Sequence, residues 1–155
     1  MSDPTGPFFS DDEIARQARQ HASALPYLMT AFARECGRSP DDAAALVGRA
    51  FASGWEEARG QGALVVVRSM ALNLVAGGGT ALGITGDERR AEARVAGLSG
   101  DEELAFFGLS RDDVDRFTGA FGPIATHLGL RAERRREGEE IVLTVDQPDD
   151  DGTGG

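Results

Sequence analysis

The side chains that could carry chemistry in this 155-residue chain are few. His21 and His127 are its two histidines, and imidazole is the side chain best suited to exchange protons near neutral pH. All sixteen basic residues are arginines, so Schiff-base chemistry, a phosphate-binding lysine and a lysine general base are excluded. An arginine can hold a carboxylate but cannot serve as a base. The catalytic residues, if there are any, are therefore unknown, with His127 and His21 as candidates.

The surroundings of both histidines favour structural roles. His21 lies on the apolar stripe of a predicted helix, and His127 lies near a helix C-terminus, where the helix dipole favours a cation. A metal site or an acid–base pair becomes possible only if the fold brings them to Glu56 or Glu57. No HExxH or CxxC spacing supports one, so we predict no metal and no cofactor.

The third apolar segment, residues 63–76, carries three polar side chains, Arg68, Ser69 and Asn73. We expect Arg68 to be buried, and an unpaired buried charge costs several kcal/mol. Its partner is either an internal carboxylate such as Glu57 or an anionic ligand. The second alternative predicts a pocket lined by Phe32, Phe51, Trp55, Phe117 and Phe121. The predicted ligand-binding residues are Arg68, Asn73, Ser69, Trp55, Tyr27 and Phe121.

Composition limits the partners and the compartment. The net charge of −10 argues against binding to nucleic acid, which needs cationic side chains to displace counterions. The longest apolar stretch is too short to span a bilayer and is interrupted by polar residues, and no leader opens the chain, so we predict no membrane contact and a cytoplasmic location. The single Cys36 cannot form an internal disulfide, and we expect it to be a buried thiol.

Two capped helices are predicted in the N-terminal part. Ser10 precedes three acidic residues, and the apolar stripe that follows has a kink or a break near Pro26. The members of this stripe are Ile14, Ala18, His21, Leu25, Leu28, Phe32 and Cys36. Ser39 and Pro40 begin a second helix that ends by Gly60.

Two segments are ambiguous between helix and strand. Residues 63–76 fit either, and a length of fourteen favours a helix. Residues 81–96 favour a hairpin with Ala91, Ala93 and Val95 facing inward, although a helix over 87–96 is a serious alternative.

The C-terminal part predicts helices followed by a second hairpin. Ser99 to Glu102 and Ser110 to Asp113 match a helix-capping pattern. In residues 129–145 four arginines and four glutamates surround a turn at Glu137 and Gly138, and these charges can pair across strands on a solvated sheet face. We therefore predict an α+β fold, with a helical N-terminal half packed on a small antiparallel sheet of two β-hairpins. Residues 1–9 are a loose leader, 10–146 a single domain and 147–155 a disordered acidic tail.

The order of elements carries a family resemblance. The segments ALGITGDERRAEARVAGL and LGLRAERRREGEEIVLTV, with the helices between them, resemble the vinyl-reductase-type small-molecule-binding domain and the 2-amino-thiazoline-carboxylate hydrolase-like family of bacteria. The resemblance covers about residues 81–145. Those families often carry a cysteine at the end of the first hairpin and another in the last strand. This chain has Ala96-Gly97-Leu98 and Ile141-Val142-Leu143 there, which puts thiol- or metal-dependent activity in doubt.

Three functions are compatible with these features. The leading hypothesis is a non-catalytic module that binds a small, mostly apolar ligand with an acidic group. The alternatives are a hydrolase resembling the thiazoline-carboxylate group, and an oligomeric structural or partner-binding protein, for example a homodimer.

Overall fold

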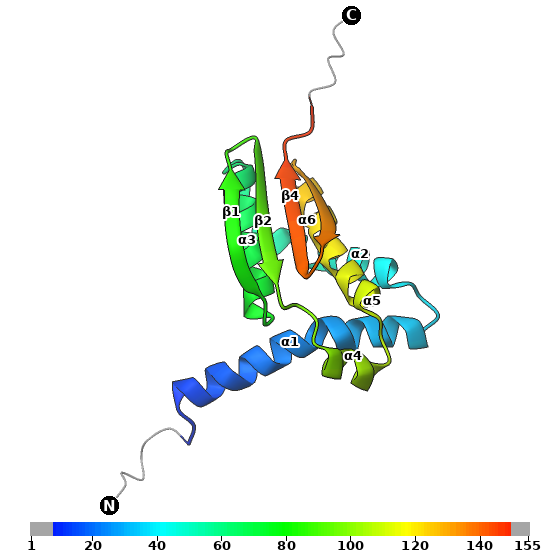
Figure 1. Cartoon of the computed structure of the whole chain (residues 1–155). Coiled ribbons are helices and arrows are strands. Elements are labelled where there is room, and N and C mark those ends of the chain that lie inside the picture. The colour runs from blue at the N-terminus through cyan, green and yellow to red at the C-terminus, as the bar shows by residue number, and fades with distance from the viewer. Residues whose placement is uncertain (1–7, 150–155) are drawn as a thin grey trace, which may run out of the picture.

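A computed structural model describes residues 8–149, so parts of the predicted leader and tail lie outside it (Figure 1). The helices are α1 (Asp11–Glu35), α2 (Pro40–Phe51), α3 (Ala63–Ala76), α4 (Asp101–Phe107), α5 (Arg111–Asp115) and α6 (Phe121–His127), with 3-10 helices η1 (Ala52–Ala58) and η2 (Arg116–Ala120). The strands are β1 (Thr80–Gly86), β2 (Arg90–Ala96), β3 (Arg131–Glu137) and β4 (Glu140–Asp146).

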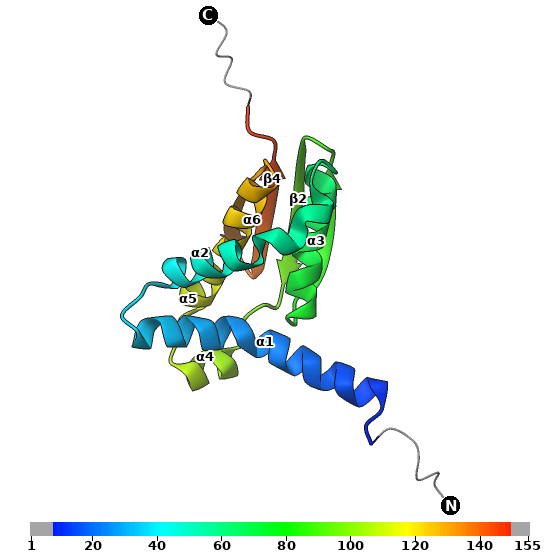
Figure 2. The ribbon, with the colours of Figure 1, turned by 180° about the vertical axis from the view of Figure 1, so that it is seen from behind.

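The four strands form one antiparallel sheet in the order β1-β2-β4-β3, built from two hairpins. The predicted α+β fold is confirmed, and residues 90–96 form a strand. Alternate residues of β2 and β4 are buried on one face, where α3 and α6 cover the sheet (Figures 1 and 2). The buried residues of this face are Ala91, Ala93, Val95, Ile141, Leu143 and Val145.

The opposite face of the sheet carries paired charges. Arg94 contacts Glu137 at 2.8 Å and Glu140 at 3.1 Å, and Arg135 contacts Glu92 at 3.0 Å. Charges do pair across strands on this face, but with β2: among the eight predicted residues themselves, the ion pairs Arg131–Glu133 and Arg135–Glu137 run along β3 and not across the hairpin. Val142 and Thr144 of the central strand β4 are buried on this face as well.

Helix α3 is present as predicted, but it buries a different face from the one we expected. Val66, Val67 and Met70 are fully buried against the sheet. Arg68 lies on the outer face and is exposed, so the prediction of a buried guanidinium is wrong. The reason is that apolar residues surround this helix on all sides: Leu64, Val65, Leu72 and Val75 are exposed too. Periodicity could not identify the face that packs.

Helix α1 begins with the predicted capping box at Ser10 and runs through Pro26 without a break. Its buried residues are Tyr27, Thr30 and Ala33, whereas most of the predicted apolar stripe faces solvent. Cys36 is also exposed, so the prediction of a buried thiol is wrong. The N-terminal half of α1 projects beyond the body of the molecule (Figures 1 and 2).

Of the short helices between the hairpins, η2 and α6 pack on α2, whereas α4 and α5 pack on α1. Ser110 forms the predicted capping box, while α4 begins after Gly100 without a side-chain cap, so the expected cap at Ser99 is absent. At Gly48, α2 approaches η2 so closely that a Cβ atom would collide with the carbonyl oxygen of Ala120. Within residues 8–149 no helix is long and apolar enough to cross a membrane.

Candidate functional site

A cavity of about 310 Å³ lies between the helices, where α1 passes the C-terminal end of α3. We call it the central cavity. Ala22, Leu25 and Pro26 of α1 form one side, and residues from the α2–η1 segment, from α3 and from 114–124 form the others. Its volume is at the lower end of the range of about 300 to 1,000 Å³ typical of small-molecule sites.

Aromatic side chains dominate the cavity wall. Phe51, Trp55, Phe117 and Phe121 line it, and these are four of the five aromatic residues predicted for a pocket. The rings of Trp55 and Phe121 meet edge to face, with centroids 6.2 Å apart. Phe32, the fifth, lies in a separate groove between α1 and α2. The wall thus offers mainly apolar contact to an occupant.

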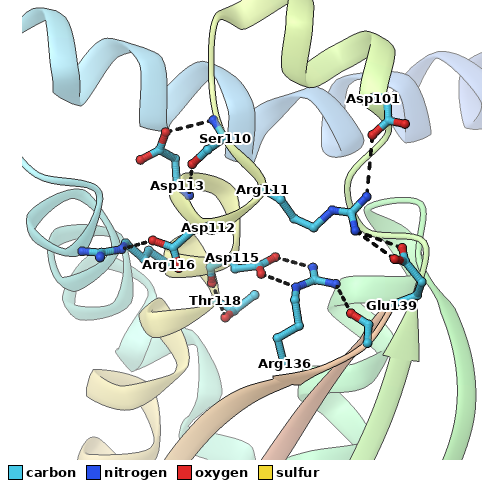
Figure 3. A network of polar contacts seen from close by, with 11 residues as sticks. Asp101, Ser110, Arg111, Asp112, Asp113, Asp115, Arg116, Thr118, Arg136 and Glu139 are labelled. Carbon is cyan, nitrogen blue, oxygen red and sulfur yellow. Dashed lines mark hydrogen bonds and ion pairs between the residues drawn. The ribbon is translucent and has the colours of Figure 1, made fainter.

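The cavity also has one buried acidic residue, Asp115, which is 5% exposed. Arg136 of β3 holds it with two parallel hydrogen bonds, from Nε at 2.5 Å and from Nη2 at 2.6 Å (Figure 3). The bonds to Asp115 raise the pKa of the Arg136 guanidinium. Since this pair neutralises itself, Asp115 adds no free charge to the wall, only carboxylate oxygens.

The remaining polar groups at the wall include hydrogen-bond acceptors, beside two donors, the indole N–H of Trp55 and the second Nδ2 hydrogen of Asn73. Asn73 donates from Nδ2 to the carbonyl of Ser69 at 2.9 Å, which leaves its own side-chain oxygen as an acceptor. Thr118 donates its hydroxyl proton to the carbonyl of Asp115 at 2.6 Å. Pro26 has no N–H to donate to the carbonyl of Ala22, one helical turn before it. These acceptors can receive a hydrogen bond from an occupant that carries a donor.

Three of the six predicted ligand-binding residues meet at the central cavity: Trp55, Phe121 and Asn73. The other three do not line it. Arg68 is exposed, and Ser69 donates to the carbonyl of Val65 at 3.0 Å. Sequence analysis missed Asp115 and Thr118, because nothing in the charge-rich stretch 111–116 marks one aspartate as buried.

Tyr27 has a structural role in the fold. Its hydroxyl donates to the carbonyl of Leu98 at 3.1 Å and accepts from the N–H of Gly100 at 3.2 Å, and its ring stacks on Phe107. Burial raises the pKa of this phenol. Tyr27 therefore ties α1 to the segment before α4 instead of facing the cavity.

The fold brings His127 to Glu56, as one of the sequence-based alternatives required, but it does not bring His21 there. The Nε2 atom of His127 lies 2.7 Å from Glu56, and Arg59 contacts the same carboxylate at 2.5 Å. These bonds, Arg59 first, lower the pKa of Glu56 to about 2. His21 is exposed and contacts Gln17 at 2.9 Å. The histidines therefore form no common centre.

In the part of the chain that the structure covers, no group of three or more His, Cys, Asp or Glu side chains could hold a metal ion. No protein-family model matches this chain, and no curated protein matches its sequence. The pattern-level resemblance to the two bacterial families therefore stays a prediction, and the central cavity is the feature of the structure that bears on function.

Proposed function

We propose that this protein binds a small, mostly apolar molecule in the central cavity and does not act on it. The observation that carries the proposal is the aromatic wall of Phe51, Trp55, Phe117 and Phe121 around a cavity of ligand size. Such sites combine a large apolar contact area with a few polar groups that orient the ligand. The acceptors on Asn73 and Ala22 are suited to that second role.

The polar end of the ligand is a hydrogen-bond donor, such as a hydroxyl, and not the acidic group expected from the sequence. Arg68 is not among the lining residues, and the one arginine beside the cavity, Arg136, is already paired with Asp115. An anionic group would have to leave water without gaining a cation, which is unfavourable. A hydroxyl could donate to either acceptor at no such cost.

The test uses three probes of equal chain length: 1-octanol, its methyl ether and octanoate. Trp55 is the only tryptophan, so its fluorescence reports directly on the cavity. We expect 1-octanol to bind most tightly, and octanoate at least about tenfold more weakly, which corresponds to about 1.4 kcal/mol. Tighter binding of octanoate would exclude the donor assignment, and no fluorescence change with any probe would exclude the site.

A matched pair of variants locates the binding. Phe51 lines the cavity and is 61% exposed, so Phe51→Ala should weaken 1-octanol binding about tenfold without unfolding the domain. Phe106 is 83% exposed and does not line the cavity, so Phe106→Ala should leave the affinity unchanged. Equal losses in the two variants would contradict the assignment of the site.

A further inference from the structure

The N-terminal half of α1 has no tertiary cover. Every residue from 11 to 22 is exposed, including Ile14 at 56%. An isolated helix of this length is only marginally stable in water, because helices usually depend on packing of an apolar face. This half of α1 therefore lacks the contacts that normally stabilise a helix.

Five exposed apolar residues of α1, together with His21, have the spacing of a coiled-coil seam. Ile14, Ala18, His21, Leu25, Leu28 and Phe32 follow one another at alternating steps of four and three. This is the heptad pattern, which places side chains along one side of a helix for packing against another helix. Leu28 is 55% exposed and Phe32 62% exposed, so the seam stays open along the body of the molecule as well.

We propose that a second copy of this chain covers the seam, with the two α1 helices packed antiparallel around a two-fold axis. In the antiparallel register that pairs the seam positions, the axis crosses the seam between His21 and Leu25, at the height of residue 23. Ile14 then lies opposite Phe32 of the second copy, and Ala18 lies opposite Leu28. His21 lies opposite Leu25, and the same surface serves both copies, as a two-fold interface requires.

Charge complementarity selects the antiparallel direction. The groove between the C-terminal half of α1 and α2, about 380 Å³ in volume, is lined by Phe32 and Leu46 and by three charged residues, Arg38, Arg49 and Asp42. Neither guanidinium forms an ion pair within residues 8–149. In the antiparallel pair the acidic first turn of the other α1, Asp11 to Glu13, lies opposite residues 33–35, which include both Arg34 and Glu35, and so approaches this groove. A parallel pair would instead place the two acidic turns side by side.

The apolar area is sufficient for a dimer. Ile14, Leu25, Leu28, Phe32 and Leu46 are 44 to 62% exposed. Half-exposed side chains of this size each present on the order of 100 Å², which gives roughly 500 Å² per copy and roughly 1,000 Å² for the pair. A biological interface should bury at least about 1,000 Å² in total and a stable one buries about 1,200 to 2,000 Å², so this area reaches the lower limit, and the aliphatic parts of flanking side chains add to it.

Sedimentation equilibrium of the full-length protein tests the interface. We expect the wild type to dimerise at micromolar concentrations, and Leu28→Glu to shift the dissociation constant upward at least a hundredfold. Leu72 on α3 is 61% exposed and lies off the seam, so Leu72→Glu should dimerise like the wild type. Ile14→Glu, on the half of α1 without tertiary contacts, should also be monomeric, and it cannot fail by unfolding the body. A monomeric wild type at 200 µM, or a loss of dimer in Leu72→Glu alone, would overturn the proposal.

The native cysteine tests the direction of the helices. Cys36 is exposed and lies 13 residues from the proposed axis, so the two copies of its sulfur are roughly 40 Å apart in the antiparallel dimer. A disulfide needs Cβ atoms about 4 Å apart, so mild oxidation of the wild type should give no covalent dimer. Ala22→Cys in a Cys36→Ser background places the thiol beside the axis and should crosslink. Rapid crosslinking through Cys36 would show a parallel pair and contradict the proposal.

Arg38 and Arg49 allow a charge-reversal rescue experiment. Arg38→Glu with Arg49→Glu should weaken dimerisation about tenfold, and adding Asp11→Arg and Asp12→Arg should restore it. Failure of the second pair to restore the affinity would contradict the proposed contact. Leu28 and Ile14 do not line the central cavity, so 1-octanol binding measured on Leu28→Glu separates a failure of this interface from a failure of the ligand site.

Discussion

Two carboxylates in this protein, those of Glu56 and Asp115, are each held by more than one hydrogen bond from basic side chains. Glu56 accepts from both Arg59 and His127, and Asp115 accepts two bonds from Arg136. The two sites differ in their environment, since Asp115 is buried while Glu56 is open to solvent. Glu56 can therefore take up a proton without a change in the core, and its lowered pKa predicts how the stability of the fold depends on pH.

Acid should weaken the fold partly through Glu56. Its pKa falls from 4.5 to about 2 in the folded protein, so the folded state favours the ionised carboxylate. The resulting stability is fully present above pH 4.5 and is lost as the pH falls toward 2. Urea unfolding at pH 7 and pH 3 should therefore show a smaller loss of stability in Glu56→Gln than in the wild type.

The neighbouring Glu57 supplies the control for this experiment. It is exposed, like Glu56, and has no ion pair within the part of the chain that the structure describes. Glu57→Gln should lose as much stability between pH 7 and pH 3 as the wild type does. If Glu56→Gln and Glu57→Gln behave alike, the bonds from Arg59 and His127 do not hold the carboxylate in solution.

At the scale of elements, pattern predicted the strands well and the buried faces of helices poorly. In β2 and β4 the side chains alternate with a period of two, and one face packs on α3 and α6, so Ala91, Ala93 and Val95 could be placed in the core from sequence. Helix α1 has a clear stripe, but that stripe is exposed because the body meets α1 at Tyr27, Thr30 and Ala33 instead.

The candidate site was predictable to a similar extent. Aromatic residues spaced along helices identified Trp55 and Phe121 as neighbours of a pocket, since large apolar side chains gather wherever helices converge. Arg136 was assigned to the solvated face of the sheet, yet it lies on the helix-covered side and reaches Asp115. The two residues of that contact are twenty-one positions apart in the sequence, and no local pattern encodes it.

The orientation of α3 can be measured by two substitutions. Met70 is fully buried, so Met70→Ala should lower the free energy of unfolding by about 2 to 5 kcal/mol. Arg68 is exposed on the opposite face, so Arg68→Ala should change it by less than about 0.5 kcal/mol. Urea denaturation of both variants gives the two values. A large loss in Arg68→Ala would restore the buried guanidinium that the sequence suggested and refute the orientation described above.

At the scale of the whole molecule, a two-layer body is joined to a helix that extends past it (Figure 1). The body has its own core between the sheet, α3 and α6, whereas residues 11–22 contribute nothing to that core. The chain also carries a net charge of −10, so two copies repel each other at long range. Association must then depend on the apolar seam and on local contacts at Arg38 and Arg49.

The stability of the first half of α1 should consequently depend on protein concentration. Partner binding stabilises only the state that it binds, so backbone amides in 15–22 should exchange slowly in the dimer and rapidly on dilution. Amides around Met70 should exchange slowly at every concentration, because the core of a single copy protects them. Hydrogen exchange at 5 and 500 µM, read by mass spectrometry of peptides covering both segments, gives the comparison. Leu28→Glu should show fast exchange in 15–22 at both concentrations, and equal protection of that segment in the wild type at both would mean that α1 is stable alone and that its open seam does not need a second copy.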